Sequence, residues 1–296
     1  MATQMSSARR GIATDEMKQV AKDEDVTLDW LLPKIASGSI IIPSNNVRPQ
    51  KIHNVGIGKG MKTKVNVNIG TSTLNVNVEE EVEKAKVAVK YHADTIMDLS
   101  DGGDVGSIRR TLLDTAPITF GTVPIYEAYN FGVEKHKNPL DITEDDYLKA
   151  FENNIKDGVD YTTIHSGITK EIAKRIFKVQ RYAGVVSKGG TITAAWMLKY
   201  DKENPYITHY DYMIELAQKY DVTFSLGDAL RPGSIDKASC FSQSRVLRAS
   251  VIFKSHLIDL SLSFTKSPAW AAILYAISPS FTSSGVGNAK CSDGVR

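Results

Sequence analysis

Side chains that can bind a ligand or carry out chemistry follow six short apolar runs of this 296-residue sequence. They are Asn68, Met97 with Asp98, Tyr126, His165, Ser187 with Lys188, and Asp228 with Arg231. If they converge, they form a pocket with an imidazole, a phenol, carboxylates and cations, which suits a small anionic substrate with several hydrogen-bonding groups. Each residue also has a structural explanation: a histidine that only holds a loop, a methionine packed in the core, an ion pair that closes a turn. Six such positions in one chain favour a shared pocket.

Two glycine pairs stand near these positions. Lys188-Gly189-Gly190 and Gly102-Gly103 resemble phosphate-binding loops, because glycine lets backbone N–H groups approach an oxyanion and lysine adds charge. A plain turn is the better explanation of either pair taken alone. On a similar scaffold Lys188 could instead form a Schiff base, as in an aldolase or lyase.

No metal site is predicted from spacing. The six histidines show no i,i+4 pairing, and Cys240 and Cys291 have no second cysteine nearby.

Periodicity predicts the elements that position these residues. Apolar or alternating runs at 64–69, 95–100, 118–124, 161–165, 184–187 and 222–226 indicate six strands, and helical spacing is found at 78–91, 107–114, 145–159, 169–178 and 210–220. Upstream, helices are expected near 15–21 and 28–37, with Pro33 interrupting the second, followed by a short strand at 40–42.

Strands that alternate with helices imply parallel pairing and an α/β fold. A (β/α)8 barrel and an open doubly wound sheet both fit. The barrel is favoured because candidate site residues follow every strand rather than one switch point. We expect an N-terminal layer over residues 1–61, a partial barrel of about six βα units over 62–236, and an atypical tail over 237–296.

Composition narrows the function classes. With 42% hydrophobic and 24% charged residues the chain can bury a large core, and its net charge of +2 gives no reason to expect nucleic acid or a membrane surface as a partner. No apolar run of about 18 residues is present, and no apolar segment follows the arginines of the N-terminus, so we expect a cytoplasmic protein.

The tail differs in character. Residues 237–296 hold thirteen serines, seven Lys or Arg and only two acidic residues. A change of reading frame explains this break, and a diverged segment with its own role, including a helix at 270–277, is the alternative.

Nine motifs upstream of the tail carry a family resemblance. They are TQMSSARRGIATDEM, IIPSN, VNVNIGTS, EEEVEKAKVAVKYHADTIMDLSDGGD, FGTVPIY, GVDYTTIHSGI, GVVSKGG, KENPYITHYDYM and TFSLGDALRPGSI. From Thr3 to Ile235 the chain resembles the phosphomethylpyrimidine synthases of thiamine biosynthesis. The resemblance implies a (β/α)8 barrel, a homodimer, and radical S-adenosylmethionine chemistry that rearranges 5-aminoimidazole ribotide into hydroxymethylpyrimidine phosphate.

The resemblance also implies the substrate contacts. These are Asn68, Met97, Tyr126, His165, the loop Ser187, Lys188 and Gly189, and the loop Asp228, Ala229, Leu230 and Arg231. Lys188 and Arg231 are expected to face the phosphate or ring substituents, with Asp228 orienting Arg231 or a substrate hydroxyl. The family usually has arginine where Lys188 stands, so a point charge replaces a bidentate contact.

Three features of the family are not found after Ile235: the EGPGHVP-type motif, the histidine ligands of a divalent metal, zinc or iron, and the Cys-x2-Cys-x4-Cys of a [4Fe–4S] cluster. We therefore expect a truncated or frame-shifted chain without turnover. The alternative is a non-catalytic ligand-binding remnant or a pseudogene product.

Overall fold

The computed structural model describes residues 2–48, 50–179 and 181–234. The chain begins with three short helices, α1 (Gln4–Arg9), α2 (Asp15–Asp23) and α3 (Leu28–Ala36), and a two-stranded antiparallel sheet of β1 (Ile40–Ile41) and β2 (Ile57–Gly58). Each helix has a threonine N-cap whose side chain accepts a backbone N–H. The predicted helices are confirmed, and α3 continues through Pro33 instead of ending there.

Five parallel strands form the main sheet. They are β3 (Asn66–Ile69), β4 (Thr95–Asp98), β5 (Thr119–Thr122), β6 (Tyr161–Ile164) and β7 (Thr223–Leu226). Each strand pairs with the next one along the chain, so the order is β3-β4-β5-β6-β7. A doubly wound sheet reverses direction at a switch point, whereas a barrel adds its strands consecutively. The consecutive order confirms the α/β, barrel-type fold class.

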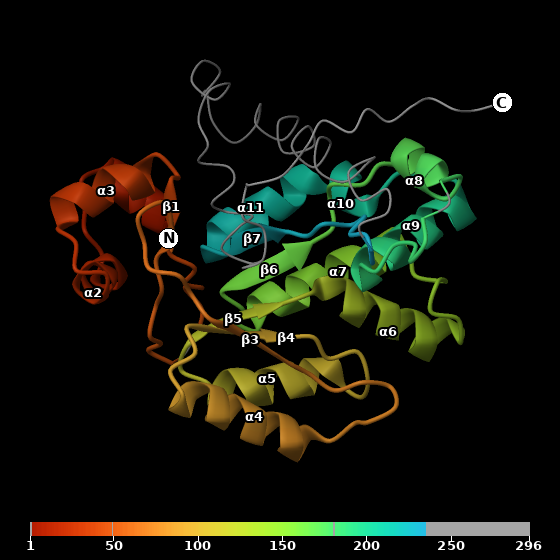
Figure 1. Ribbon diagram of the computed structural model, residues 1–296, viewed down its shortest axis with the longest axis horizontal. Helices are drawn as coiled ribbons and strands as arrows, with labels where there is room; N and C mark the ends of the chain where they lie inside the picture. The colour runs from red at the N-terminus through yellow and green to blue at the C-terminus, as the bar shows by residue number, and fades with distance from the viewer. Residues whose placement is uncertain (1, 49, 180, 235–296) are drawn as a thin grey trace.

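Helices follow the strands in chain order. They are α4 (Val78–Lys90), α5 (Val105–Thr115), α6 (Pro124–His136), α7 (Glu144–Lys156), α8 (Lys170–Ile176), α9 (Lys188–Tyr200), α10 (Pro205–Thr208) and α11 (Tyr210–Tyr220). Figure 1 shows α4 and α5 along one side of the sheet and α6, α7 and α11 further along it. Outward side chains of the strands pack on these helices; Phe224, for example, meets Phe151 and Tyr210 edge-on. No described helix is long and apolar enough to cross a membrane.

One predicted strand is wrong. The run 184–187 does not join the parallel sheet; Val185 makes only an isolated antiparallel bridge with Pro232, and Val186 donates its N–H to the Arg231 carbonyl at 2.9 Å. This short run therefore holds the segment after β7 in place. The described part of the sheet has five strands, not six.

The opposite face of the sheet is polar. In register, Asn68 lies beside Met97, Met97 beside Gly121, and Gly121 beside Tyr161. The Tyr161 ring lies across Gly121, where an added Cβ would be 2.1 Å from the ring, and its hydroxyl reaches the Asn66 side-chain oxygen at 2.9 Å. Tyr161 thereby bridges four strands across the inside of the sheet.

A buried ion pair joins the N-terminal region to the amino ends of the strands. Arg48 Nη1 lies 2.5 Å from Asp160 Oδ2, and Asp160 also accepts the N–H groups of Asn45 and Phe120. Burial raises the pKa of Asp160 to about 6, while Arg48 and the two N–H groups oppose that shift. The predicted boundaries at 61/62 and 236/237 stay predictions, and residues 237–296 lie outside the described residues.

Candidate functional site

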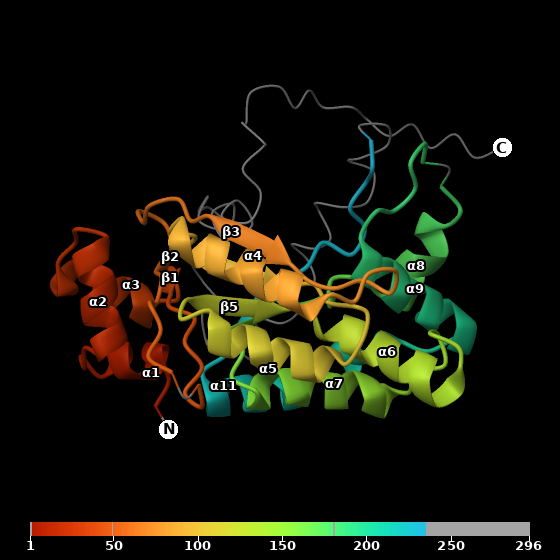
Figure 2. The same cartoon turned by 90° about the horizontal axis from the view of Figure 1, so that it is seen from below.

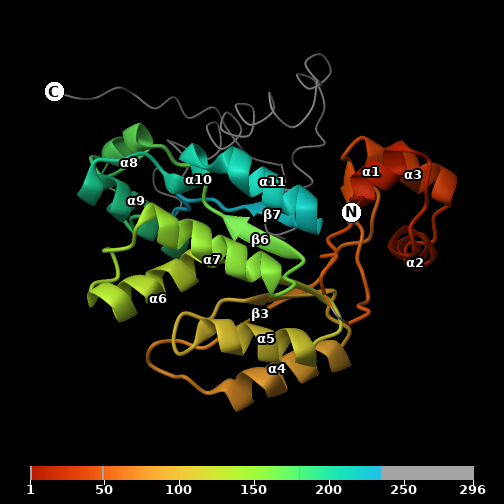
Figure 3. The same cartoon turned by 180° about the vertical axis from the view of Figure 1, so that it is seen from behind.

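The carboxyl ends of the strands form the candidate site. In Figure 2 the arrow of β3 points toward α8, α9 and the segment that follows β7, while α1, α2 and α3 lie at the other end of the sheet. Figure 3 shows the same separation from behind. Loops after parallel strands meet at one edge, which is where barrel proteins place their sites.

His165 stands where three segments meet. It follows β6 directly, and its ring lies against Gly189 at the start of α9 and Gly227 at the end of β7. A Cβ added at Gly189 would be 2.3 Å from the ring Cε1, and one at Gly227 would be 3.0 Å from Nε2. The predicted His165 and Gly189 are therefore in direct contact.

Burial keeps the His165 imidazole neutral. The pKa of His165 is lowered to about 4, first because the ring is buried and second because Arg231 adds positive charge nearby. Its Nδ1 is buried and has no hydrogen-bond partner within the described part of the chain. The neutral ring is enclosed by Gly189 and Gly227, and an added Cβ at Gly189 would lie 2.6 Å from this Nδ1. Asn204 fixes the loop by donating from Nδ2 to the carbonyls of His165 and Ile168, both at 2.9 Å.

Lys188 lies at the first position of α9, after Ser187, whose hydroxyl accepts the Gly190 N–H at 3.3 Å. The ammonium of Lys188 forms an ion pair with Asp101 and sits 5.0 Å from the ring centre of Tyr126. Partial burial lowers the pKa of Lys188. Burial raises the pKa of Tyr126, so its phenol is protonated at neutral pH. Lys188 and Tyr126 are brought together as the sequence predicts.

The segment 228–231 is held by its own backbone and by α9. Asp228 Oδ1 accepts the Leu230 N–H at 3.0 Å, and burial raises the pKa of Asp228 while Arg231 opposes that shift. Ala229 and Leu230 are buried, and an added Cβ at Gly190 would be 2.1 Å from the Ala229 carbonyl oxygen.

The charged pair in this segment does not behave as an ion pair. Arg231 is exposed, and no ion pair joins it to Asp228 among residues 181–234 or the earlier described ranges. Its charge acts at a distance instead, lowering the pKa of His165 and opposing the shift of Tyr126.

Asn68 and Met97 form a separate part of the site. They are register partners on β3 and β4 and share the polar face of the sheet, where Asn68 is exposed and Met97 half-buried. Asn68 accepts a hydrogen bond from Asn66 at 2.9 Å. Among the described residues, no hydrogen bond or ion pair joins Asn68 or Met97 to His165, Lys188 or Arg231, although they lie on the same face of the sheet.

Sequence reasoning missed three residues of this region: Asp101, Tyr129 and Asn204. Asp101 follows β4 in the motif DLSDGGD, so its position after a strand was a usable signal. The Tyr129 ring lies 5.9 Å from Lys188, one helical turn after Tyr126. That spacing has meaning only once 124–136 is recognised as a helix.

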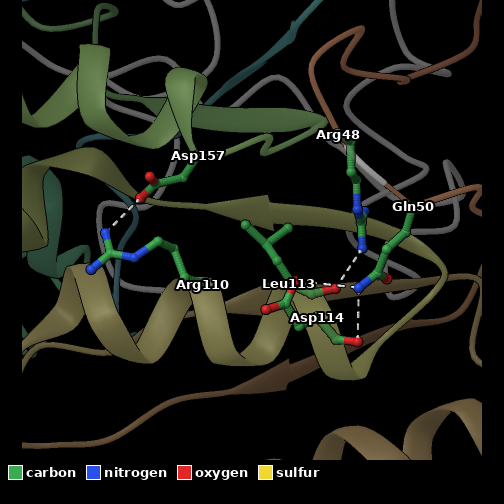
Figure 4. A pocket seen from close by; sticks show the side chains of 6 residues that line it. All are labelled: Arg48, Gln50, Arg110, Leu113, Asp114 and Asp157. Atoms are coloured by element: carbon green, nitrogen blue, oxygen red, sulfur yellow. Dashed lines mark hydrogen bonds and ion pairs between the residues drawn. The ribbon is translucent and has the colours of Figure 1, made fainter.

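A cavity of about 170 Å³ lies elsewhere, toward the amino ends of the strands (Figure 4). It is lined by Arg48, Gln50, Arg110, Leu113, Asp114 and Asp157. Figure 4 shows Arg110 directed at Asp157, and Gln50 at Asp114, so these polar groups of the cavity pair with one another. Arg48 is paired with Asp160, although its buried Nε has no partner among the described residues. None of the predicted site residues lines this cavity.

Comparison with known proteins decides the family. Residues 3–254 match the family model described as "Radical SAM ThiC family". The chain belongs to the radical SAM ThiC family. The ThiC-family match confirms the predicted resemblance and extends past Ile235. Phosphomethylpyrimidine synthase of Pyrococcus furiosus is 50% identical over 236 residues, which is 80% of this chain and 55% of that protein.

More distant ThiC-family relatives agree. The phosphomethylpyrimidine synthase of Methanopyrus kandleri is 40% identical over 257 residues, covering 87% of this chain and 59% of that protein. The one of Thermodesulfovibrio yellowstonii is 40% identical over 237 residues, or 80% of this chain and 55% of that protein. The chain thus spans about half the length of the curated relatives it matches.

Proposed function

We propose that this chain carries the substrate-binding part of a phosphomethylpyrimidine synthase of thiamine biosynthesis and binds 5-aminoimidazole ribotide at the carboxyl ends of β3 to β7. The observation that carries the proposal is the meeting of His165, Gly189 and Gly227, which joins three of the family motifs around one buried, neutral imidazole. A neutral ring with an unpartnered Nδ1 suits a ring or hydroxyl group of the ligand.

The remaining residues suit the anionic part of a ribotide. Lys188 supplies an ammonium beside Tyr126, and Arg231 supplies a second cation at the same edge of the sheet. Asn68 and Met97 lie on the polar face behind them. In this proposal the substrate-binding residues are those predicted from the sequence, with Asp101 as the partner that positions Lys188.

The described residues offer no ligand set for the metal ion that the family implies. Within 2–48, 50–179 and 181–234, no group of three His, Cys, Asp or Glu side chains is placed to hold a metal ion. Cys240 and Cys291 lie outside those ranges, and two cysteines cannot complete a three-cysteine motif. We therefore derive no step through a [4Fe–4S] cluster, S-adenosylmethionine or a divalent metal. We propose that these 296 residues bind ligand without turnover, in the cytoplasm and, in the intact family, as a homodimer.

Ligand-induced stabilisation tests the binding proposal. 5-Aminoimidazole ribotide is expected to raise the melting temperature of the 296-residue chain, because a ligand that binds only the folded state stabilises it by mass action. His165→Ala should abolish the shift. His136→Ala, an exposed histidine in the last turn of α6, is the matched control and should keep it. An equal shift in all three proteins, or none in the wild type, would refute the proposal.

The absence of turnover has its own test. The chain is incubated anaerobically with iron, sulfide, S-adenosylmethionine and a reductant, and 5′-deoxyadenosine is measured. We expect none. Formation of deoxyadenosine together with cluster absorbance would show that this chain assembles the cofactor and would remove the non-catalytic interpretation.

A further inference from the structure

Arg181 is a buried cation in which two of the three guanidinium nitrogens have no hydrogen-bond partner within the described residues. It lies between α8 and α9 and is 9% exposed. Its Nη1 donates to the Leu230 carbonyl at 2.7 Å, whereas Nε and Nη2 are buried and have no partner within the described residues. Leaving buried donors of a charged group unpaired is costly, so this arrangement needs an explanation.

The unused donors form one geometric unit. Nε–H and the adjacent Nη2–H lie on the same edge of the planar guanidinium, and that edge matches the two oxygens of a carboxylate or phosphate. The group is always protonated, so it cannot avoid the cost by losing its charge. A bidentate oxyanion is the ligand that this edge fits.

No acidic side chain of the described residues fills that edge. Asp228 is near enough for Arg181 to oppose the shift of its pKa, but no ion pair joins the two, and Asp228 Oδ1 is occupied by the Leu230 N–H at 3.0 Å. Burial still raises the pKa of Asp228, which is not what a close bidentate partner would produce.

The position of Arg181 connects it to the candidate site. Its Nη1 bond to Leu230 places the guanidinium against the 228–231 segment, and the Val186–Arg231 backbone bond and the Val185–Pro232 bridge hold the same two segments together. Gly190 of α9 packs on the Ala229 carbonyl of that segment. An anion at the free edge of Arg181 would therefore adjoin the loops that the proposed function assigns to substrate.

We propose that Arg181 is an anion-binding residue of this site, which takes a phosphate monoester or a carboxylate through its Nε and Nη2. The proposal deepens the proposed function and rests on it for the identity of the ligand. Two sources share this chemistry, the phosphoryl group of a ribotide and the carboxylate of an amino-acid-derived cosubstrate.

Arg181→Lys is the informative variant, because lysine keeps the charge and can still reach the Leu230 carbonyl but cannot make two parallel bonds to one anion. Arg175→Lys is the matched control, since it makes the same substitution in the last turn of α8, where the side chain is exposed and lies 3.7 Å from Glu171. Melting temperatures are measured for the 296-residue chain with inorganic phosphate, ribose 5-phosphate and methionine, against chloride at equal ionic strength.

For the wild type and Arg175→Lys we expect stabilisation beyond chloride, and for Arg181→Lys a dissociation constant weaker by about tenfold or more. A response to the two phosphates identifies a phosphoryl site, and a response to methionine alone identifies a carboxylate site. No stabilisation of the wild type, or equal binding by Arg181→Lys, overturns the proposal. If Arg181→Lys fails to fold, the wild-type titration and Arg181→Gln, which keeps a donor for Leu230, decide it in the same way.

The outcome is separable from that of the proposed function. Ribotide binding that is lost in His165→Ala but unchanged in Arg181→Lys would refute the role of Arg181 and leave the proposed function standing. If the chain does not bind ribotide but binds phosphate in a way that depends on Arg181, the proposed function is refuted and the anion-binding role of Arg181 stands.

Discussion

Replacing Gly189 by alanine tests the packing at the centre of the candidate site. An added Cβ would lie 2.3 Å from Cε1 and 2.6 Å from Nδ1 of His165, far inside van der Waals contact. The ring cannot simply move away, because it is 6% exposed and its other edge faces Gly227, where an added Cβ would lie only 3.0 Å from Nε2. Overpacking of this kind costs about 1–3 kcal/mol.

The expected loss is measurable by denaturant and thermal unfolding. For a domain of this size, about 1–3 kcal/mol corresponds to a melting temperature lower by about 2–10 °C. Gly106→Ala is a matched control, since Gly106 is also the second residue of its helix, α5, and an added Cβ would meet nothing closer than 3.4 Å. There, alanine should be neutral or stabilising by about 0.5–1 kcal/mol through its helix propensity.

A double-mutant cycle assigns the loss to the ring. In a His165→Ala background the Cβ at position 189 meets no imidazole, so Gly189→Ala should cost little, and the coupling energy should be about 1 kcal/mol or more. Equal stabilities of Gly189→Ala and Gly106→Ala would refute the close approach of α9 to His165. A cost that persists without the ring would show that α9, not the imidazole, is disturbed.

Three further predictions concern buried ionisable side chains. Burial raises the pKa of Asp221 from 3.8 to about 6, so the stability that its protonated form contributes is present below about pH 3.8 and is lost as the pH rises through 6. In urea melts, Asp221→Asn should raise the free energy of unfolding by about 1–3 kcal/mol at pH 7.5 and leave it unchanged at pH 3.5. A variant whose stability depends on pH as the wild type's does would contradict this. His165, with its pKa lowered from 6.5 to about 4, destabilises the fold as the pH falls through that window, and a value above 6 from an NMR titration would be inconsistent with the buried ring. Arg109→Met leaves Glu127, its partner at 2.6 Å, buried without a counterion and should cost about 3–5 kcal/mol, whereas the exposed Arg110→Met should cost less than about 1 kcal/mol; similar losses for both in urea melts would argue against the buried pair.

Strands and amphipathic helices were predictable because periodicity reports burial directly. The helix predicted at 78–91 is Val78–Lys90, and the strand predicted at 222–226 is Thr223–Leu226. The strand predicted at 184–187 failed for a physical reason. A short apolar run with β-branched residues fits any half-buried extended segment, and only the tertiary contact with Arg231 and Pro232 decides which partner it takes.

Four helices went unrecognised, the short α1 and α10 and the long α6 and α9, and the two long ones were missed for different reasons. Helix α6 starts at Pro124 directly after β5, so the apolar run of the strand continues into the helix and hides its start. Helix α9 starts at Lys188 and contains Gly189 and Gly190 in its first turn, where low helix propensity argues for a loop. The strand ends that hold the candidate residues could be read from the sequence, but contacts between residues far apart in the chain, such as Lys188 with Asp101, could not.

The glycine pair after Lys188 shows how packing can imitate a ligand-binding motif. From sequence, Lys188-Gly189-Gly190 resembled a phosphate loop or a plain turn, and the structure gives a third reason for both glycines. A Cβ at 189 would strike the His165 ring, and a Cβ at 190 would come within 2.1 Å of the Ala229 carbonyl oxygen. Both positions need glycine whether or not an anion binds there. The presence of the two glycines is therefore no evidence for or against a phosphate site. The discriminating groups are those that packing does not explain: the unpartnered Nδ1 of His165 and the free edge of Arg181.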